Sequence, residues 1–184
     1  MLFRSTYHIF EEGTNLTSGK QFLALYNRSD LVFKIKEIYV TQAGGVAGTA
    51  LWIDVCRWDG YQPSGTRVGT NTLDGRMPGS GANLDAVFGM TNLSGSDRTI
   101  LKQIYTHNAN LFGTQGVHES GTSTKGIMPN LLQMTNLAPG AGVPGAQTLT
   151  LVSGQGVTVG QALDFSQASG GAYSAHMLFT IEPA

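Results

Sequence analysis

Charged side chains are scarce in this sequence. Asp, Glu, Lys and Arg together make up 12% of the 184 residues, about half the share that is usual for soluble domains. The formal net charge is −1, so the composition argues against non-specific binding to nucleic acid or to an anionic membrane, which needs a basic patch. Low charge also leaves little repulsion between subunits, which suits a protein that works as an assembly.

Cysteine and long apolar runs are also lacking. Cys56 is the only cysteine, which excludes an intrachain disulfide. It alternates with bulky neighbours on either side, which is more typical of a packed small side chain than of a nucleophile. The first residues lack the apolar segment and cleavage site of a signal peptide, and no apolar run is long enough to span a membrane. We therefore expect a protein that is made and folds in a cytosol, without a membrane partner.

Glycine, in contrast, is abundant, with 25 residues. A chain rich in Gly, Thr, Ser and Asn forms helices poorly and favours strands and turns. Short apolar segments with a period of two recur along the chain, separated by Gly- and Pro-rich connections and without alternating helices. The pattern predicts an all-β fold with about eight strands, an antiparallel β-sandwich that resembles a jelly roll and has long Gly/Pro-rich loops.

The most regular stretch is 31–58, which we interpret as a hairpin of two long strands joined by a glycine-rich turn at 43–48. The phase of the apolar residues changes between Ile35 and Ile38, which predicts a β-bulge near Lys36 and Glu37 because one extra residue reverses the face of every later side chain.

Two strands show an apolar row on one face. Because each row needs a partner to cover it, we predict that the two rows share one core. These residues are Leu51, Ile53, Val55, Tyr173, Ala175, Met177, Phe179 and Ile181.

The remaining segments leave more than one interpretation open. Residues 1–20 fit an edge strand or an arm that docks on a neighbouring subunit, and 21–184 fit a single β-sandwich domain. Residues 83–90 begin like a helix, but Gly89 ends the pattern after a single turn, which is as compatible with a helical turn as with none. Residues 99–111 have two mixed faces, which favours a strand at a sheet edge or against a partner.

The sequence contains no pattern that predicts catalysis. The four histidines, His8, His107, His118 and His176, lack the i, i+2 or i, i+4 spacing of a local metal pair. His176 faces away from the apolar row of its strand and is expected to be exposed or interfacial. Glycine clusters do not precede helices, and no Gly-x-Ser-x-Gly elbow occurs. We expect a protein that is not an enzyme and has no metal or cofactor.

Aromatic residues are the best candidates for a binding surface. Trp52 and Trp58 share the strand face opposite the apolar row, and Tyr61 follows them. Tyr105 and His107 share one face of 99–111. The face that carries the tryptophans could be covered by a second layer of the same chain, by another subunit, or by a sugar ring that stacks on an indole.

Three stretches together resemble a known group of proteins. They are LVFKIKEIYV at 31–40, ALWIDVCRWDG at 50–60 with the turns that follow it, and an ending that runs from TLTLVSGQGVTVG to GGAYSAHMLFTIEP. In strand and turn chemistry they resemble tailed-bacteriophage virion proteins of the jelly-roll decoration or head-fibre type. The resemblance covers about residues 31–75 and 147–183 and carries over no site residues.

The resemblance implies a non-enzymatic structural protein on the outside of a bacteriophage head. Such a protein is made in the host cytoplasm, forms a homotrimer and binds the major capsid protein. The alternative is a carbohydrate-binding or host-adhesion module of a phage fibre or tail, which would use Trp52, Trp58 and Tyr61 to bind a host surface glycan.

Overall fold

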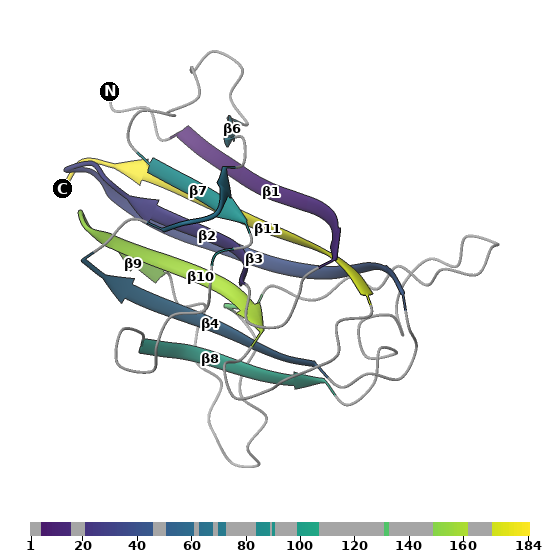
Figure 1. The fold of residues 1–184 in the computed structure, drawn as a ribbon. Coiled ribbons are helices and arrows are strands. Elements are labelled where there is room, and N and C mark those ends of the chain that lie inside the picture. Colours follow the sequence, from purple (N-terminus) through teal and green to yellow (C-terminus); the bar gives the residue numbers. More distant parts are fainter. Residues whose placement is uncertain are drawn as a thin grey trace.

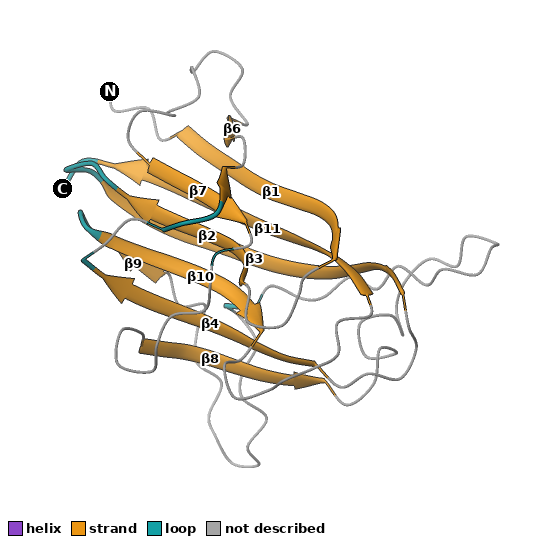
Figure 2. Cartoon of the chain, viewed as in Figure 1, coloured by secondary structure: helices purple, strands orange, loops and turns teal. Residues whose placement is uncertain are grey.

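The computed structural model describes the β-rich part of the chain, and the statements below concern that part. The described residues are 5–15, 21–45, 51–60, 63–67, 70–72, 84–88, 90, 99–106, 131–132, 149–161 and 171–184. They form two antiparallel β-sheets that enclose one main core and contain no helix (Figures 1 and 2). The predicted all-β sandwich is therefore confirmed.

Each sheet has a simple spatial order. The five-stranded sheet runs β6 (Thr70–Thr72), β1 (Ser5–Asn15), β11 (Gly171–Glu182), β3 (Val32–Gly45), β9 (Leu149–Leu151). The six-stranded sheet runs β5 (Thr66–Arg67), β7 (Leu84–Phe88), β2 (Gln21–Asn27), β10 (Gln155–Gln161), β4 (Leu51–Asp59), β8 (Thr99–Thr106).

The pairing of the longer strands is that of a jelly roll. Strand β1 pairs with β11, β2 with β10, β3 with β9, and β4 with β8. The first half of the chain thus pairs with the second half in reverse order, as in a long antiparallel ribbon. Rolling the ribbon places the first and third pairs in one sheet and the second and fourth pairs in the other. Eight strands arranged in this way form the double Greek key of a jelly roll.

The predicted hairpin at 31–58 is wrong. Both strands exist, but β3 pairs with β11 and β9, whereas β4 pairs with β10 and β8 in the other sheet. Alternation identifies a strand with one buried face, but it does not say which neighbour the strand pairs with. The β-bulge is confirmed, because the register between β3 and β11 shifts at Lys36, between the pairs Glu37–Leu178 and Ile35–Phe179.

The N-terminal segment belongs to the sandwich. Ser5–Asn15 pairs with β11 on one side and with the short β6 on the other, and Tyr7 and Ile9 are buried in the core. These residues therefore form a strand of the sandwich that lies between β6 and β11. Residues 84–88, where a helical turn was one option, form strand β7 instead.

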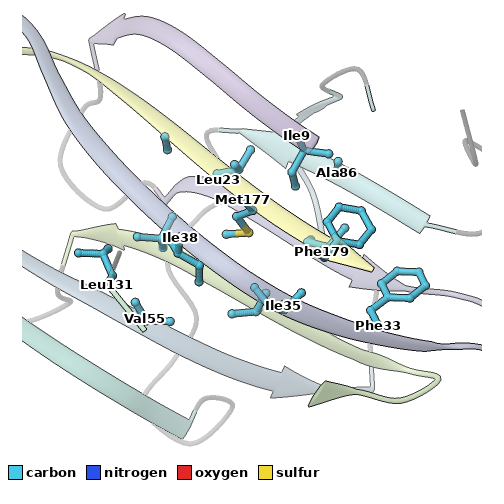
Figure 3. Close-up of a cluster of buried hydrophobic side chains, with 14 of the residues drawn as sticks. Ile9, Leu23, Phe33, Ile35, Ile38, Val55, Ala86, Leu131, Met177 and Phe179 are labelled. Carbon is cyan, nitrogen blue, oxygen red and sulfur yellow. The ribbon is translucent and has the colours of Figure 1, made fainter. Parts of the chain in front are cut away.

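Side chains from both sheets form the main core (Figure 3). Phe179 lies at its centre, with ring centroids 5.5 Å from both Tyr7 and Phe33. Leu131 closes one part of the core and donates its backbone N–H to the Ile38 carbonyl at 2.8 Å. The predicted shared core is confirmed for Val55, Ala175, Met177 and Phe179, which are buried, and Ile181 packs against them. The side chains of Leu51, Ile53 and Tyr173 lie outside the described part.

Asn27 joins the connections at one end of the sandwich. Its side chain is fully buried, and its Nδ2 donates to the carbonyls of Leu31 at 2.7 Å and Leu151 at 3.2 Å. Its Oδ1 accepts from the N–H and hydroxyl of Ser29. The Asn27 carbonyl accepts from the N–H of Gly154, whose φ of +80° suits glycine at this corner between β9 and β10. Asn27 thus connects two segments that cross between the sheets, the one from β2 to β3 and the one from β9 to β10.

Candidate functional site

The outward face of the five-stranded sheet carries four half-buried ring-bearing side chains. We call His8, Phe10, Tyr39 and His176 the aromatic face. Their strand neighbours Ile9, Val40, Ala175 and Met177 point into the core, so strict alternation turns these rings outward. Strand β11 lies between β1 and β3 (Figure 1) and places Phe10, His176 and Tyr39 in one cross-strand row.

Three of these rings form a stacked group. The ring centroids of His8 and Phe10 are 5.0 Å apart, those of His8 and His176 are 5.3 Å apart, and those of Phe10 and His176 are 5.9 Å apart. Their planes differ by no more than 19°. Because each ring restricts the rotation of its neighbours, the group presents a fixed surface without ordering a loop.

The two imidazoles are also hydrogen-bonded to each other. His8 Nε2 lies 3.2 Å from His176 Nδ1, although the residues are 168 positions apart in the sequence. One nitrogen donates its N–H and the other accepts with its lone pair, so at least one imidazole must be neutral. The expectation that His176 is exposed or interfacial agrees with its half-buried, outward position.

Tyr39 adds a polar group on the other side of His176. Its hydroxyl donates a hydrogen bond to Glu37 Oε2 at 3.1 Å. Burial is the main cause that raises the pKa of Tyr39 above its ordinary value of 10.0, and the hydrogen bond and the negative charge of Glu37 raise it further. The phenol is therefore neutral near pH 7, and the carboxylate keeps acceptor capacity for another group.

Trp58, which was predicted to face a ligand, is covered by the chain itself. Its side chain is 1% exposed and stacks on Tyr26, with ring centroids 5.9 Å apart. Tyr26 and Trp58 both pair with Gly156 of the strand between them, and a Cβ on Gly156 would lie 2.3 Å from the Trp58 ring. The missing side chain gives the indole its space. Of the alternatives for this face, the structure supports cover by the same chain at Trp58.

Trp58 belongs to a second buried cluster on the outward face of the six-stranded sheet. The cluster consists of Ala24, Tyr26, Trp58, Val87 and Met90. Polar side chains on the same face are also buried, namely Gln21, Asp54, Asp85 and Thr158, and so is Cys56. Arg28 Nε forms an ion pair with Asp85 Oδ2 at 3.1 Å. This face contributes to folding and does not present side chains to solvent at these positions.

The structure brings two of the other predicted site residues together at the level of the backbone. Trp52 and Tyr105 are register partners in β4 and β8, although their side chains lie outside the described part. Tyr61 and His107 lie outside the described residues, as does His118. Sequence reasoning missed His8, Phe10 and Tyr39, although the outward phase of each could be read from alternation in its own strand.

Other chemical groups are few in the described part of the chain. These residues contain no group of three or more His, Cys, Asp or Glu side chains that could hold a metal ion. They also contain no helix that is long and apolar enough to cross a membrane. The aromatic face can therefore stack against planar or apolar groups and exchange hydrogen bonds through imidazole, phenol and carboxylate.

Comparison with known proteins finds no matching family model, no matching curated protein and no matching solved structure.

Proposed function

We propose that the chain is a non-enzymatic structural protein on the outside of a bacteriophage head, where it binds the major capsid protein. The main support is the jelly-roll pairing of the ribbon from β1/β11 to β4/β8. Viral capsid proteins are prominent users of this fold, although the fold alone does not define a function. The resemblance in the strand and turn chemistry at 31–75 and 147–183 points the same way.

The aromatic face is the surface that we assign to the contact with the capsid. Aromatic side chains are enriched at the centres of protein interfaces. Stacking fixes Phe10, His8 and His176 before binding, so few side-chain rotamers would be lost on contact. A sheet face with these properties suits a partner that is itself rigid, such as a capsid shell.

We further propose a homotrimer in which β8 contributes to the subunit contact. In the described part of the chain, three of the four outermost strands contain only two or three residues, whereas β8 contains eight. A long edge strand presents unpaired backbone groups that another chain can bond. Light scattering at micromolar concentration should give three times the monomer mass, and a monomer or dimer would contradict the trimer.

Gold-labelled antibody against the purified chain tests the location. Applied to phage particles that carry the gene, the label should appear over the head at regular positions. Labelling of the tail would favour the alternative function, and unlabelled particles that also lack the chain by mass spectrometry would contradict both.

A binding assay tests the assigned face. Phe10→Ala should weaken binding to heads that lack the chain, whereas Val152→Ala should not. Val152 is a suitable control because its side chain is 48% exposed and lies after β9, away from the aromatic face. Equal binding by the two variants would contradict the assignment.

The alternative is a glycan-binding module of a fibre or tail. One observation favours it: Tyr39 and Phe10 flank His176 on the outward sheet face, with the Glu37 carboxylate beside them. Aromatic rings with a nearby acceptor suit a sugar ring, which has an apolar face and hydroxyl donors. Because Trp58 is buried, we assign this role to the aromatic face and no longer to Trp58. Retention of the chain on a host-glycan array, lost in Tyr39→Ala, would support it.

A further inference from the structure

We propose that His8 and His176 form a binding site for a divalent transition-metal ion, such as Zn²⁺, that links the first and last strands of the jelly roll. The site goes beyond the structural role proposed above and does not depend on it. Its ligands would be Nε2 of His8 on β1 and Nδ1 of His176 on β11.

The separation of the two nitrogens fits a shared metal ion. Zn²⁺ binds imidazole nitrogen at about 2.0–2.1 Å, so two nitrogens in a tetrahedral site lie about 3.3–3.4 Å apart. The observed distance between His8 Nε2 and His176 Nδ1 is 3.2 Å. A metal ion could therefore replace the bridging proton once each ring turns so that its lone pair points at the shared ion, with little change in the distance between the two nitrogens.

The surroundings hold both rings in orientation. Phe10 stacks on His8 and on His176, and the planes of the two imidazoles differ by only 10°. The antiparallel register fixes the two strands, since His8 pairs with Leu178 and Phe10 pairs with His176. A pair of ligands held in this way loses little conformational freedom when a metal binds.

The chemistry of the site selects the class of ion. Neutral imidazole suits zinc, copper and nickel, whereas magnesium and calcium prefer oxygen ligands. The described residues supply no group of three His, Cys, Asp or Glu ligands. Two carboxylates lie near the pair by register: Glu11 follows Phe10 on β1 and pairs with Ala175, and Glu37 pairs with Leu178, the residue opposite His8, and accepts the Tyr39 hydroxyl.

Metal binding should be coupled to pH and to folding. Both ligands must be neutral to bind the ion, so protonation of either imidazole at low pH should weaken binding. Glu37 is a charged group on the neighbouring strand β3. Its negative charge should stabilise a metal cation bound by the two imidazoles. The ion would join residues 168 positions apart, and binding to the folded state alone stabilises that state.

Isothermal titration of the intact chain with Zn²⁺ at pH 7.5 tests the site. We expect saturable binding of one ion, and a midpoint of thermal unfolding that rises by roughly 5–10 °C when free Zn²⁺ exceeds the dissociation constant a hundredfold. His8→Gln and His176→Gln should each weaken Zn²⁺ binding by more than roughly 100-fold. The loss of a residue that only contacts a metal ligand weakens binding by roughly 10–100-fold, and here a ligand itself is lost. Val152→Ala is the control, because this exposed side chain follows β9, and the variant should bind as the wild type does. Mg²⁺ should give no shift.

A second measurement needs no variant and guards against misfolding of the substituted chains. Diethyl pyrocarbonate modifies accessible histidines, and mass spectrometry locates the modified residues. Zn²⁺ should protect His8 and His176 in the wild-type protein, and Mg²⁺ should not. Absence of saturable binding, unchanged affinity in His8→Gln, or equal protection by Mg²⁺ would each overturn the proposal.

Discussion

The two outward faces of this sandwich differ in how far their described side chains are buried, and the sequence alone does not show this difference. The face of the six-stranded sheet carries a tryptophan, a tyrosine and several polar side chains, and all of them are buried. The outward side of the five-stranded sheet carries the four half-buried rings of the aromatic face. Both stack aromatic rings from different strands: Phe10 and His176 come from neighbouring strands, whereas Tyr26 and Trp58 meet across β10.

The comparison shows how exposure separates folding from binding. Trp58 and Tyr26 have already buried their surface within the chain, so their stacking stabilises the folded state. Phe10, His8 and His176 still expose part of each ring, and a partner that covers them would gain apolar burial. We therefore expect a binding function on the outward face of the five-stranded sheet, although the tryptophans had indicated the six-stranded sheet.

A matched pair of alanine substitutions should separate the faces most clearly. Trp58→Ala removes a large side chain that is 1% exposed and should lower the free energy of unfolding by about 3–5 kcal/mol. Phe10→Ala removes a half-buried ring and should cost less, about 1–2 kcal/mol. Urea denaturation followed by circular dichroism measures both. Equal losses would show that the two faces are equally covered in solution.

Filling the space beneath Trp58 should give an intermediate effect. A Cβ at position 156 would meet the indole at 2.3 Å, so Gly156→Ala should lower the free energy of unfolding by about 1–3 kcal/mol. A double-mutant cycle isolates the cause. In a Trp58→Ala background the same substitution should cost little, because the ring that it meets is gone. An undiminished cost there would mean that Gly156 is needed for another reason.

Much of the strand pattern could be predicted from the sequence. Alternation identified the core row of β11 and the phase change in β3 that produces the bulge at Lys36. It also predicted that 99–111 lies at a sheet edge or against a partner, and β8 is one of the two outermost described strands of its sheet. These features depend on local spacing, which is visible in one strand at a time.

The pairing of strands and the location of the candidate site could not be predicted in this way. Strands β3 and β4 follow one another in the sequence but lie in different sheets, because a rolled ribbon pairs segments that are distant in the sequence. Alternation within a strand does not reveal which strand it pairs with. The same topology brings His8 to His176, a pair for which spacing along the chain gives no signal. For Trp58, alternation separates the two faces of a strand but does not reveal whether the outward face is covered, so the sequence left open cover by the same chain, by another subunit or by a sugar ring.

The smallest expected effect concerns Tyr39 on the aromatic face. Burial, followed by the hydrogen bond to Glu37 and the charge of Glu37, raises the pKa of Tyr39 above 10.0. Since the folded-state pKa lies above the unfolded value, the stabilisation is fully present below about pH 10 and is lost as pH rises through the folded-state pKa. A difference titration between wild type and Tyr39→Phe, followed by tyrosinate absorbance, isolates this residue.

Replacing the carboxylate should sharpen this result. Glu37→Gln removes the negative charge, so the pKa of Tyr39 should fall, but it should stay above 10.0 because burial is the largest cause. Glu182→Gln is the control, since that carboxylate forms an ion pair with Lys34 on the same sheet. A fall of the Tyr39 pKa to 10.0 in Glu37→Gln would show that the ring is solvated. The aromatic face would then be more open than the half-buried rings indicate, and the difference between the two faces would be larger.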